Sequence, residues 1–189
     1  MTQTPKSQFD QNINQLSNLE KRWFAIYTKY KCEKYVSEHL QKKGITSYVP
    51  IITKRKRYQR KIKHYQVPLI NCYVFVFIYE NQYLKTLETE YVLKFLRNGK
   101  DLLSIPQIEI DVLRRVVGEV EDIELNPLDK SICAGDLVEI TTGQLIGLKG
   151  KVIKQEGKHN FLIDLETIGF QLKMQVEGKL LRQVHSLSY

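Results

Sequence analysis

Cysteine is scarce in this chain of 189 residues. The three cysteines, Cys32, Cys72 and Cys133, are far apart and have neither C-x-x-C spacing nor a histidine at metal-ligand spacing. An odd number of isolated thiols argues against a disulfide framework and against a zinc site. We therefore expect reduced thiols, no bound metal and a cytoplasmic location.

Long apolar runs are also absent. The densest run is Tyr73–Tyr79, far below the roughly 18 residues that a membrane-spanning helix needs. The first twenty residues contain no apolar core of a signal peptide. The hydrophobic fraction of 42% and the charged fraction of 26% are those of a folded globular chain. We expect a soluble protein with no membrane partner.

Catalytic motifs are missing as well. The sequence contains no glycine-rich phosphate loop, no H-E-x-x-H and no G-x-S-x-G, and its four histidines are isolated from one another. These absences favour a binding protein over an enzyme and predict no cofactor.

Acidic residues are scarce in one region of the chain. Between Lys21 and Lys63, fourteen Lys and Arg accompany only two Glu, so this region has a net charge of +12 within an overall charge of +8. Seven of the cations lie within Lys54–Lys63, where their mutual repulsion must be offset. Such a block predicts contact with a polyanion, most commonly nucleic acid and next an anionic membrane surface. A solvated lysine-rich face is the alternative.

The apolar pattern divides the chain into two folded domains. Residues 1–20 are polar and predict a flexible tail. Residues 21–118 alternate strand and helix patterns, which predicts an α+β domain of ferredoxin-like character. An acidic stretch at 119–133, broken by Pro127, is typical of a linker. Short β-rich runs between glycines at 134–189 predict an SH3-like β-barrel.

Local patterns place the main elements. We expect strands at 23–27, 47–52, 73–79 and 91–96, and helices at 82–89 and 106–117, in addition to a helix that ends at Gly44. The first helix would bury Cys32, Val36 and Leu40, and the last Ile108, Val112, Leu113 and Val116. In the barrel, Phe170, Leu172, Met174 and Val176 alternate with polar residues and predict an inward row.

One ridge of the first helix combines cations with rings. Lys31, Tyr35, His39 and Lys42 fall at helical spacing, and Lys29 precedes them. Such a ridge suits contact with phosphates and an unstacked base. The plainer interpretation is that Tyr35 covers the edge of the core and the other side chains are solvated.

The densest basic segment predicts a β-hairpin arm. It lies between apolar strands and contains Tyr58, Ile62 and Tyr65, which favours extended structure over a helix. Its cations are Lys54, Arg55, Lys56, Arg57, Arg60, Lys61 and Lys63.

Two motifs, in this order, resemble the NusG family of transcription elongation factors. The first comprises Arg22–Lys29, Tyr48-Val49-Pro50 and Val67–Val76, which resemble the N-terminal (NGN) domain. The second comprises Gly135–Ile140 with Gly143, Gly147, Gly150 and Val152, which resemble the KOW motif of the C-terminal barrel, with Gly150 as its motif glycine. The resemblance covers about residues 21–185 and is closer to specialised paralogs, such as RfaH and the antiterminators of polysaccharide operons. Asn71-Cys72 replaces the usual Pro-Gly.

The resemblance implies a role in transcription. The NGN domain would bind the clamp helices of RNA polymerase, bridge the cleft to the gate loop, and suppress pausing or termination. The clamp-helix surface would fall on Tyr27, Ile70, Tyr73 and Phe75, and the gate-loop contact near Lys85 and Thr86. Plain core packing is the alternative for Tyr73 and Phe75. Non-template DNA would contact Lys29, His39 and Lys42, three residues that helical geometry also selects.

The basic arm, Lys54–Lys63, is richer in cations than the family pattern requires. From this charge we expect the arm to follow upstream duplex DNA or nascent RNA. The resemblance implies that the barrel recruits ribosomal protein S10 or the termination factor Rho near Phe170. Because the alternation places Phe170 in the inward row, we expect it at the rim of the barrel at best. Some relatives refold this domain into a helical hairpin, but the glycines and β-branched residues here favour a stable barrel. We expect a monomer. A ribosome- or RNA-associated KOW protein is the alternative function.

Overall fold

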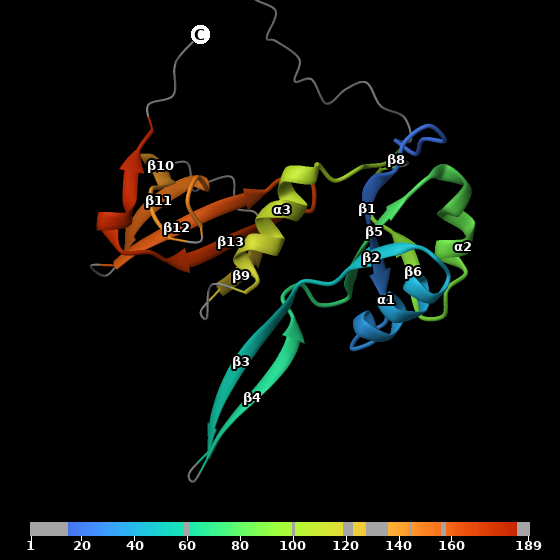
Figure 1. The fold of residues 1–189 in the computed structure, drawn as a ribbon, viewed down its shortest axis with the longest axis horizontal. Coiled ribbons are helices and arrows are strands. Elements are labelled where there is room, and N and C mark those ends of the chain that lie inside the picture. The colour runs from blue at the N-terminus through green and yellow to red at the C-terminus, as the bar shows by residue number, and fades with distance from the viewer. Residues whose placement is uncertain are drawn as a thin grey trace, which may run out of the picture. The chain divides into compact units, whose positions relative to one another are not determined.

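The computed structural model describes residues 15–58, 61–99, 101–118, 123–127, 136–143, 145–155 and 158–184. The chain forms two compact units, each visible in Figure 1. The first unit contains the described parts of Met1–Val49 and Cys72–Ile105, and the second contains those of Pro50–Asn71 and Pro106–Tyr189. Arg60, Cys133 and most of the expected tail and linker lie outside the described residues.

An antiparallel sheet in the order β2-β5-β1-β6 forms the framework of the first unit. Its strands are β1 (Arg22–Thr28), β2 (Thr46–Tyr48), β5 (Tyr73–Ile78) and β6 (Val92–Phe95). β1 and β5 are rich in aromatic and β-branched residues, which pack well on a pleated surface. They pair from Arg22 opposite Ile78 to Tyr27 opposite Tyr73. The expected central strand is confirmed, because β5 is paired on both sides.

Three helical segments accompany this sheet. They are α1 (Glu33–Lys42), the short 3-10 helix η1 (Glu80–Gln82) and α2 (Tyr83–Leu87). α1 stops near the predicted place, because Gly44 adopts a φ of +76° that glycine accommodates without strain. A small hairpin of β7 (Arg97–Asn98) and β8 (Asp101–Leu102) completes the unit.

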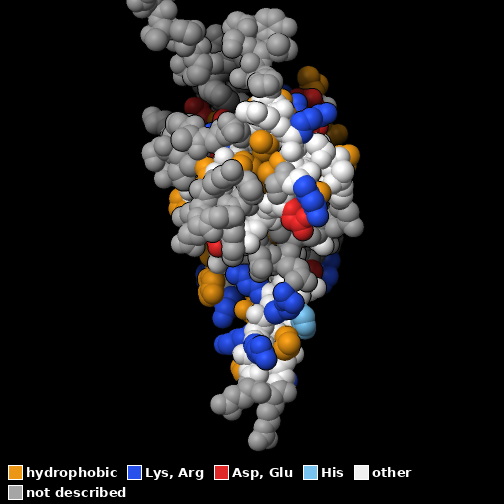
Figure 2. All heavy atoms as spheres, turned by 90° about the vertical axis from the view of Figure 1, so that its left-hand side faces the viewer, with side chains coloured by type: hydrophobic (Ala, Val, Ile, Leu, Met, Phe, Trp, Pro, Cys, Tyr) orange, Lys and Arg blue, Asp and Glu red, His pale blue; other side chains and the backbone are white. Residues whose placement is uncertain are grey.

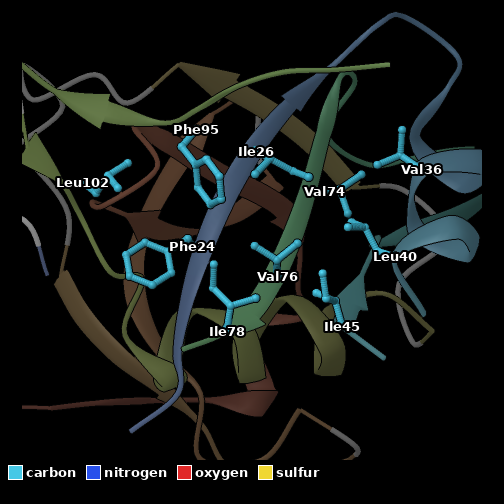
Figure 3. Close-up of a cluster of buried hydrophobic side chains, with 10 residues drawn as sticks. All are labelled: Phe24, Ile26, Val36, Leu40, Ile45, Val74, Val76, Ile78, Phe95 and Leu102. Atoms are coloured by element: carbon cyan, nitrogen blue, oxygen red, sulfur yellow. The ribbon is translucent and has the colours of Figure 1, made fainter. Parts of the chain in front are cut away.

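Apolar side chains on one face of the sheet and on α1 form the core of the first unit, and Tyr83 and Leu87 of α2 pack against them. The core side chains point toward one another in Figure 3 and comprise Phe24, Ile26, Val36, Leu40, Ile45, Val74, Val76, Ile78, Phe95 and Leu102. The predicted helix stripe is confirmed for Val36 and Leu40, which are fully buried, whereas Cys32 lies at the N-cap of α1 and is half-buried. Burying a side chain of this size contributes roughly 1.5–3 kcal/mol. The cluster therefore holds α1 on the sheet and fixes the face that α1 presents outward.

The other face of the β1–β5 pair is aromatic. Trp23 lies opposite Phe77, with ring centroids 5.0 Å apart. Phe75 is fully buried, and its ring centroid lies 6.2 Å from that of Tyr48 on β2. A strand that buries both faces reads as a continuous apolar run, which is the pattern of residues 73–79.

Residues 15–20 belong to the first unit, so the expectation of a flexible tail over 1–20 is wrong for this part. The side-chain oxygen of Gln15 accepts hydrogen bonds from the backbone nitrogen and the hydroxyl of Ser104, at 2.6 and 2.7 Å. Leu16 packs against the core. The polar composition hid this attachment because polar side chains provide much of it.

The basic segment forms the predicted hairpin, β3 (Ile51–Tyr58) and β4 (Lys61–Pro68). The expected strand at 47–52 is wrong, because Pro50 separates β2 from β3. Proline has no N–H for a sheet ladder, and the Pro50 carbonyl instead accepts a 2.7 Å hydrogen bond from the Leu69 nitrogen.

α3 (Gln107–Val116) opens the C-terminal part of the second unit. Its buried side chains are Ile110, Val112, Leu113 and Val116. The expectation that Ile108 points inward is wrong: 72% of it is exposed, and the fully buried Ile110 takes its place. The stripe follows the i, i+3 spacing of residues 110, 113 and 116, which is shifted from the predicted one.

Two polar contacts join α3 to the barrel. The Oε1 atom of Glu109 accepts hydrogen bonds from the backbone nitrogen and hydroxyl of Thr167, at 3.1 and 2.8 Å. Arg115 donates to the carbonyl of Ile146 at 2.5 Å. α3 is therefore grouped with the barrel, whereas the sequence had assigned residues 106–118 to the first domain.

The barrel sheet has the order β14-β10-β11-β12-β13-β9 among the described residues. Its strands are β9 (Ile123–Pro127), β10 (Asp136–Ile140), β11 (Lys149–Gln155), β12 (Lys158–Leu165), β13 (Phe170–Gln175) and β14 (Leu181–Gln183), with the 3-10 helix η2 (Gly178–Leu180) before the last. β9 lies within the expected acidic linker, which is a correction. Its Ile123 is buried and pairs with Met174, whereas Glu124 is exposed.

Buried side chains from β12 and β13 fill the barrel interior. Phe161, Leu165, Leu172 and Met174 are all at most 1% exposed, which confirms the inward positions of Leu172 and Met174. Gln171 is also buried, contrary to the predicted alternation, and its amide donates a 2.6 Å hydrogen bond to Asp164. Among the described residues of the chain, no helix is long and apolar enough to cross a membrane.

Candidate nucleic-acid and polymerase interfaces

The predicted ridge on α1 is shorter than its sequence spacing suggested. α1 begins at Glu33, and Lys31 lies before it with a φ of +64°, a left-handed conformation that no helical residue adopts. The helix itself therefore carries Tyr35, His39 and Lys42. Lys29 and Lys31 are exposed in the adjoining turn.

Tyr35 and His39 form a stacked pair on the outer face of α1. Their ring centroids are 3.8 Å apart and their planes meet at 25°. The Nδ1 atom of His39 lies 2.9 Å from the Tyr35 carbonyl oxygen, which holds the imidazole in place. Tyr35 is 38% exposed. The pair presents a flat ring surface on which an unstacked base can stack.

Tyr91 extends this surface from the turn after α2. Its ring meets that of Tyr35 edge-on, with centroids 5.2 Å apart. The Lys29 ammonium lies 5.5 Å from the Tyr91 ring centroid, and the Lys29 nitrogen donates to the Tyr91 carbonyl at 3.0 Å. The fold thus joins a cation from the end of β1 to aromatic rings from two other segments. Tyr91 was not predicted from the sequence, because no local pattern links it to α1.

Glu90 places one negative charge beside these rings. The Tyr35 hydroxyl donates a 2.7 Å hydrogen bond to its Oε2 atom. This bond, followed by a second from Tyr91, lowers the pKa of Glu90, and the same contact raises the pKa of Tyr35. Glu90 is therefore ionised at neutral pH. We call Lys29, Tyr35, His39, Lys42, Glu90 and Tyr91 the α1 cluster.

Tyr27 and Tyr73 form a second pair at the end of the β1–β5 ladder. Their ring centroids are 4.3 Å apart, and the Tyr73 hydroxyl donates to the Tyr27 hydroxyl at 2.5 Å. Burial, and then this hydrogen bond, raises the pKa of Tyr73. The Lys94 ammonium lies 5.4 Å from the Tyr27 ring centroid. Tyr27 is half-buried and so remains accessible on this pair.

The other predicted clamp-helix residues are buried. Ile70, Tyr73 and Phe75 are 1%, 5% and 0% exposed. Tyr73 and Phe75 share the aromatic face with Tyr27, whereas Ile70 belongs to the second unit. In this conformation, packing describes Tyr73 and Phe75 better than an open docking surface does.

Both residues predicted to contact the gate loop have internal partners. Thr86 is fully buried and donates a 2.8 Å hydrogen bond to the Gln82 carbonyl one helical turn earlier. Lys85 donates a 2.7 Å hydrogen bond to the carbonyl of Lys43, the residue that caps the C-terminus of α1. The preceding residue, Leu84, is 64% exposed and offers the accessible surface here.

The described hairpin residues from 53 to 58 and from 61 to 66 are all exposed. They include six predicted nucleic-acid contacts, namely Lys54, Arg55, Lys56, Arg57, Lys61 and Lys63. The strand pairing places Lys56 directly opposite Lys63, whereas Arg55 and Arg57 lie opposite His64 and Ile62.

The two predicted barrel residues have different environments. A Cβ atom on Gly150 would lie 2.4 Å from the Leu162 carbonyl oxygen and 2.8 Å from the Phe161 ring, so this position needs glycine for close strand packing. Phe170 is half-buried at the start of β13, opposite Leu165. It also lines a pocket of about 480 Å³ together with β9 residues such as Leu125.

The chain is similar to a family of transcription factors. Residues 21–114 match the NusG family, described as transcription termination factor nusG. A Thermotoga maritima NusG structure, whose title reads "Domain interaction in Thermotoga maritima NusG", matches with a TM-score of 0.51 and 18% identity over 89% of this chain and 100% of that one. Conformations B and A of the MjSpt4:Spt5 complex match with TM-scores of 0.30 and 17% identity, over 87% and 86% of this chain and 97% of those chains.

No curated protein matches the sequence. The Thermotoga maritima structure shares the fold, with an NGN domain followed by a KOW barrel. The family match covers the domain that carries the α1 cluster and the Tyr27–Tyr73 pair. The chain therefore belongs to the NusG family of transcription factors.

Proposed function

We propose that this chain is a non-enzymatic elongation and antitermination factor that binds RNA polymerase and the non-template DNA strand. Within the family it would be a specialised paralog that acts on particular operons, such as those for polysaccharides. The observation that carries the proposal is the α1 cluster in the NusG-like domain. There the stacked Tyr35–His39 pair lies beside the Tyr91 ring, which the Lys29 ammonium also contacts.

The α1 cluster suits a strand whose bases are unpaired. Tyr35 and His39 offer a ring surface for one base, while Lys29 and Lys42, together with Lys31 in the adjoining turn, attract the phosphates on either side. A paired duplex does not present base faces, so a stacking surface favours single-stranded DNA. Holding that strand while contacting polymerase would oppose the rearrangements that accompany a pause.

Tyr27 is the proposed anchor for polymerase. It is the accessible member of the Tyr27–Tyr73 pair, and its ring is rigidly supported by the neighbouring ring and hydroxyl. Supported aromatic side chains are typical energetic centres of protein interfaces. Leu84 and Leu93, which are 64% and 55% exposed, add apolar surface in the same domain.

The barrel would recruit a second protein, S10 or Rho, near the half-buried Phe170. This division leaves polymerase and DNA to the NGN domain. A factor with these partners would work in the cytoplasm.

Two measurements test the proposal with the full chain. The first is the lifetime of polymerase pauses on a defined template, which the protein should shorten. Tyr35→Leu and Lys42→Ala should reduce the effect at least several-fold, whereas Lys34→Ala, which removes a charge elsewhere on α1, should preserve it.

The second measurement is retention on immobilised core RNA polymerase. Tyr27→Ala should lower retention, and Tyr27→Phe, which keeps the ring, should largely restore it. Co-sedimentation with ribosomes without binding to polymerase would contradict the proposal and favour the ribosome-associated alternative.

A further inference from the structure

The β3–β4 hairpin has two faces of different chemistry. In its register, Lys54 lies opposite Tyr65, Lys56 opposite Lys63, and Tyr58 opposite Lys61. Alternate residues of a strand share a face, and directly paired residues do as well. One face therefore carries four lysines and two tyrosines, which we call the Lys–Tyr face. It comprises Lys54, Lys56, Tyr58, Lys61, Lys63 and Tyr65.

The opposite face carries the arginines. Arg55 lies opposite His64, and Arg57 lies opposite Ile62. This Arg face has no tyrosine among the described residues, so the hairpin's two tyrosines lie on the same side as its lysines.

The Lys–Tyr face is open to solvent. Tyr58 and Tyr65 are 45% and 39% exposed, and all four lysines are exposed. Figure 2 shows Lys and Arg side chains gathered over the hairpin at the lower end of the view, with hydrophobic side chains between them. The Lys56 ammonium lies 5.4 Å from the Tyr58 ring centroid, so cation and ring present one continuous surface.

The order of these side chains along the ladder is also informative. A row with one tyrosine and one lysine lies at each end, and the Lys56–Lys63 pair lies between them. Four residues separate the two tyrosine rows, which corresponds to about 14 Å at 3.4 Å per residue. Directly opposed like charges destabilise a hairpin. The central lysine pair is therefore stabilised when an anion lies over it.

We propose that the Lys–Tyr face binds single-stranded nucleic acid, with one base stacked on Tyr58, another on Tyr65, and the intervening phosphates over Lys56 and Lys63. Every base has a face that can stack on an aromatic ring, so this recognition tolerates sequence. Duplex DNA would contact the lysines but would not stack on either tyrosine ring, because its bases are already stacked on one another. The proposal rests on the proposed function only in assuming that the chain works on nucleic acid.

The test uses the full chain and three fluorescein-labelled probes: a 12-nucleotide oligouridine, a 12-nucleotide oligothymidine and a 12-base-pair duplex DNA. The double variant Tyr58→Leu/Tyr65→Leu keeps the charge and removes both rings. Its affinity for the single strands should fall about tenfold or more, whereas duplex affinity should change less than twofold. Equal losses for single strands and duplex, or no loss, would overturn the proposal.

A matched charge control compares the two faces. Lys56→Ala/Lys63→Ala and Arg55→Ala/Arg57→Ala each remove two cations from exposed positions of the same hairpin. The lysine variant should weaken single-strand binding at least threefold more than the arginine variant. Equal effects would show a diffuse basic arm and contradict a specific face.

The choice of probe separates two sources of the ligand. Tighter binding of oligouridine points to the transcript, and tighter binding of oligothymidine points to an exposed DNA strand. These assays contain no polymerase. A failure of polymerase retention would therefore contradict the proposed function. It would leave the proposal for the hairpin to be decided by the oligonucleotide assays alone.

Discussion

The hydroxyl of Tyr35 donates a 2.7 Å hydrogen bond to the carboxylate of Glu90, although 55 positions separate the two residues. The contact restrains the ring on which we propose that a base stacks. It also places an ionised carboxylate beside that ring, because the bond from Tyr35 lowers the pKa of Glu90. Glu90 thus orients the stacking surface and at the same time repels an incoming phosphate.

Glu90→Gln should strengthen binding of single-stranded DNA. The amide oxygen can still accept the Tyr35 hydrogen bond, whereas the negative charge is lost. Removing a charge several ångströms from a phosphate at the surface is worth about two- to fivefold in affinity at low salt. Fluorescence anisotropy with an oligothymidine probe measures the change.

The matched control is Glu80→Gln. It removes an exposed carboxylate that lies just after β5, whereas the Tyr27–Tyr73 pair lies at the opposite end of that strand. It should leave DNA affinity within experimental error. Weaker binding by Glu90→Gln would contradict the prediction. It would mean that the carboxylate increases DNA affinity by orienting Tyr35 more than it decreases that affinity by repelling phosphate.

Glu109 predicts a pH dependence of stability in the second unit. Its Oε1 atom accepts hydrogen bonds from the backbone nitrogen and the hydroxyl of Thr167. Its Oε2 atom is buried without a hydrogen-bond partner among the described residues. Burial raises the pKa of the Glu109 carboxyl group. The folded state therefore holds this proton more tightly than the unfolded state. That contribution to stability is present below the ordinary carboxyl pKa and is lost as pH rises through the raised value.

Glu109→Gln should remove this part of the pH profile. The amide oxygen can accept the same two hydrogen bonds and carries no charge at any pH. Between about pH 4 and pH 8, the urea midpoint of the wild type should fall more than that of the variant. Asp111→Asn, an exposed change on the same helix, should keep the wild-type profile. Parallel profiles for wild type and Glu109→Gln would contradict the prediction.

Local patterns were sufficient for much of the fold. The apolar run at 73–79 predicted a central strand because both faces of β5 are covered, and the mixture of cations and rings at 54–65 predicted the hairpin. Spacing also found Tyr35 and His39, since their stacking depends only on one turn of α1. Each of these features depends only on residues that are close together in the sequence.

The features that sequence reasoning missed depend on tertiary contacts. Glu90 and Tyr91 reach the α1 cluster from the turn after α2, and no spacing rule relates them to α1. Acidic composition hid β9, although Ile123 and Leu125 alternate with polar residues and pair with β13. Lys31 fitted helical spacing but lies in a left-handed turn, which spacing alone cannot exclude.

Cys72 predicts a stability difference between substitutions in the turn before β5. It has a φ of +65°, its nitrogen donates a 2.6 Å hydrogen bond to the buried carboxylate of Glu33, and its carbonyl accepts from Thr28 at 2.9 Å. In this conformation a residue with a Cβ atom destabilises the folded state by about 1–2 kcal/mol relative to glycine, and a β-branched residue destabilises it more.

Cys72→Gly should therefore be at least as stable as the wild type, and Cys72→Val should be less stable than the glycine variant by about 2 kcal/mol. Urea unfolding followed by circular dichroism compares the three proteins. Equal stability of the Gly and Val variants would show that the turn relaxes out of the left-handed conformation.

The hairpin predicts a steep salt dependence of nucleic-acid binding. Four exposed lysines lie on its Lys–Tyr face, and each phosphate that one of them neutralises on a single strand lowers the log–log slope by about 0.7. The wild type should therefore show a slope of about −3 with oligouridine. Changing Lys54, Arg55, Lys56 and Arg57 to Ala leaves two described cations and should bring the slope to about −1.5. An unchanged slope in this variant would place the phosphate contacts elsewhere on the chain and remove the hairpin from the interface.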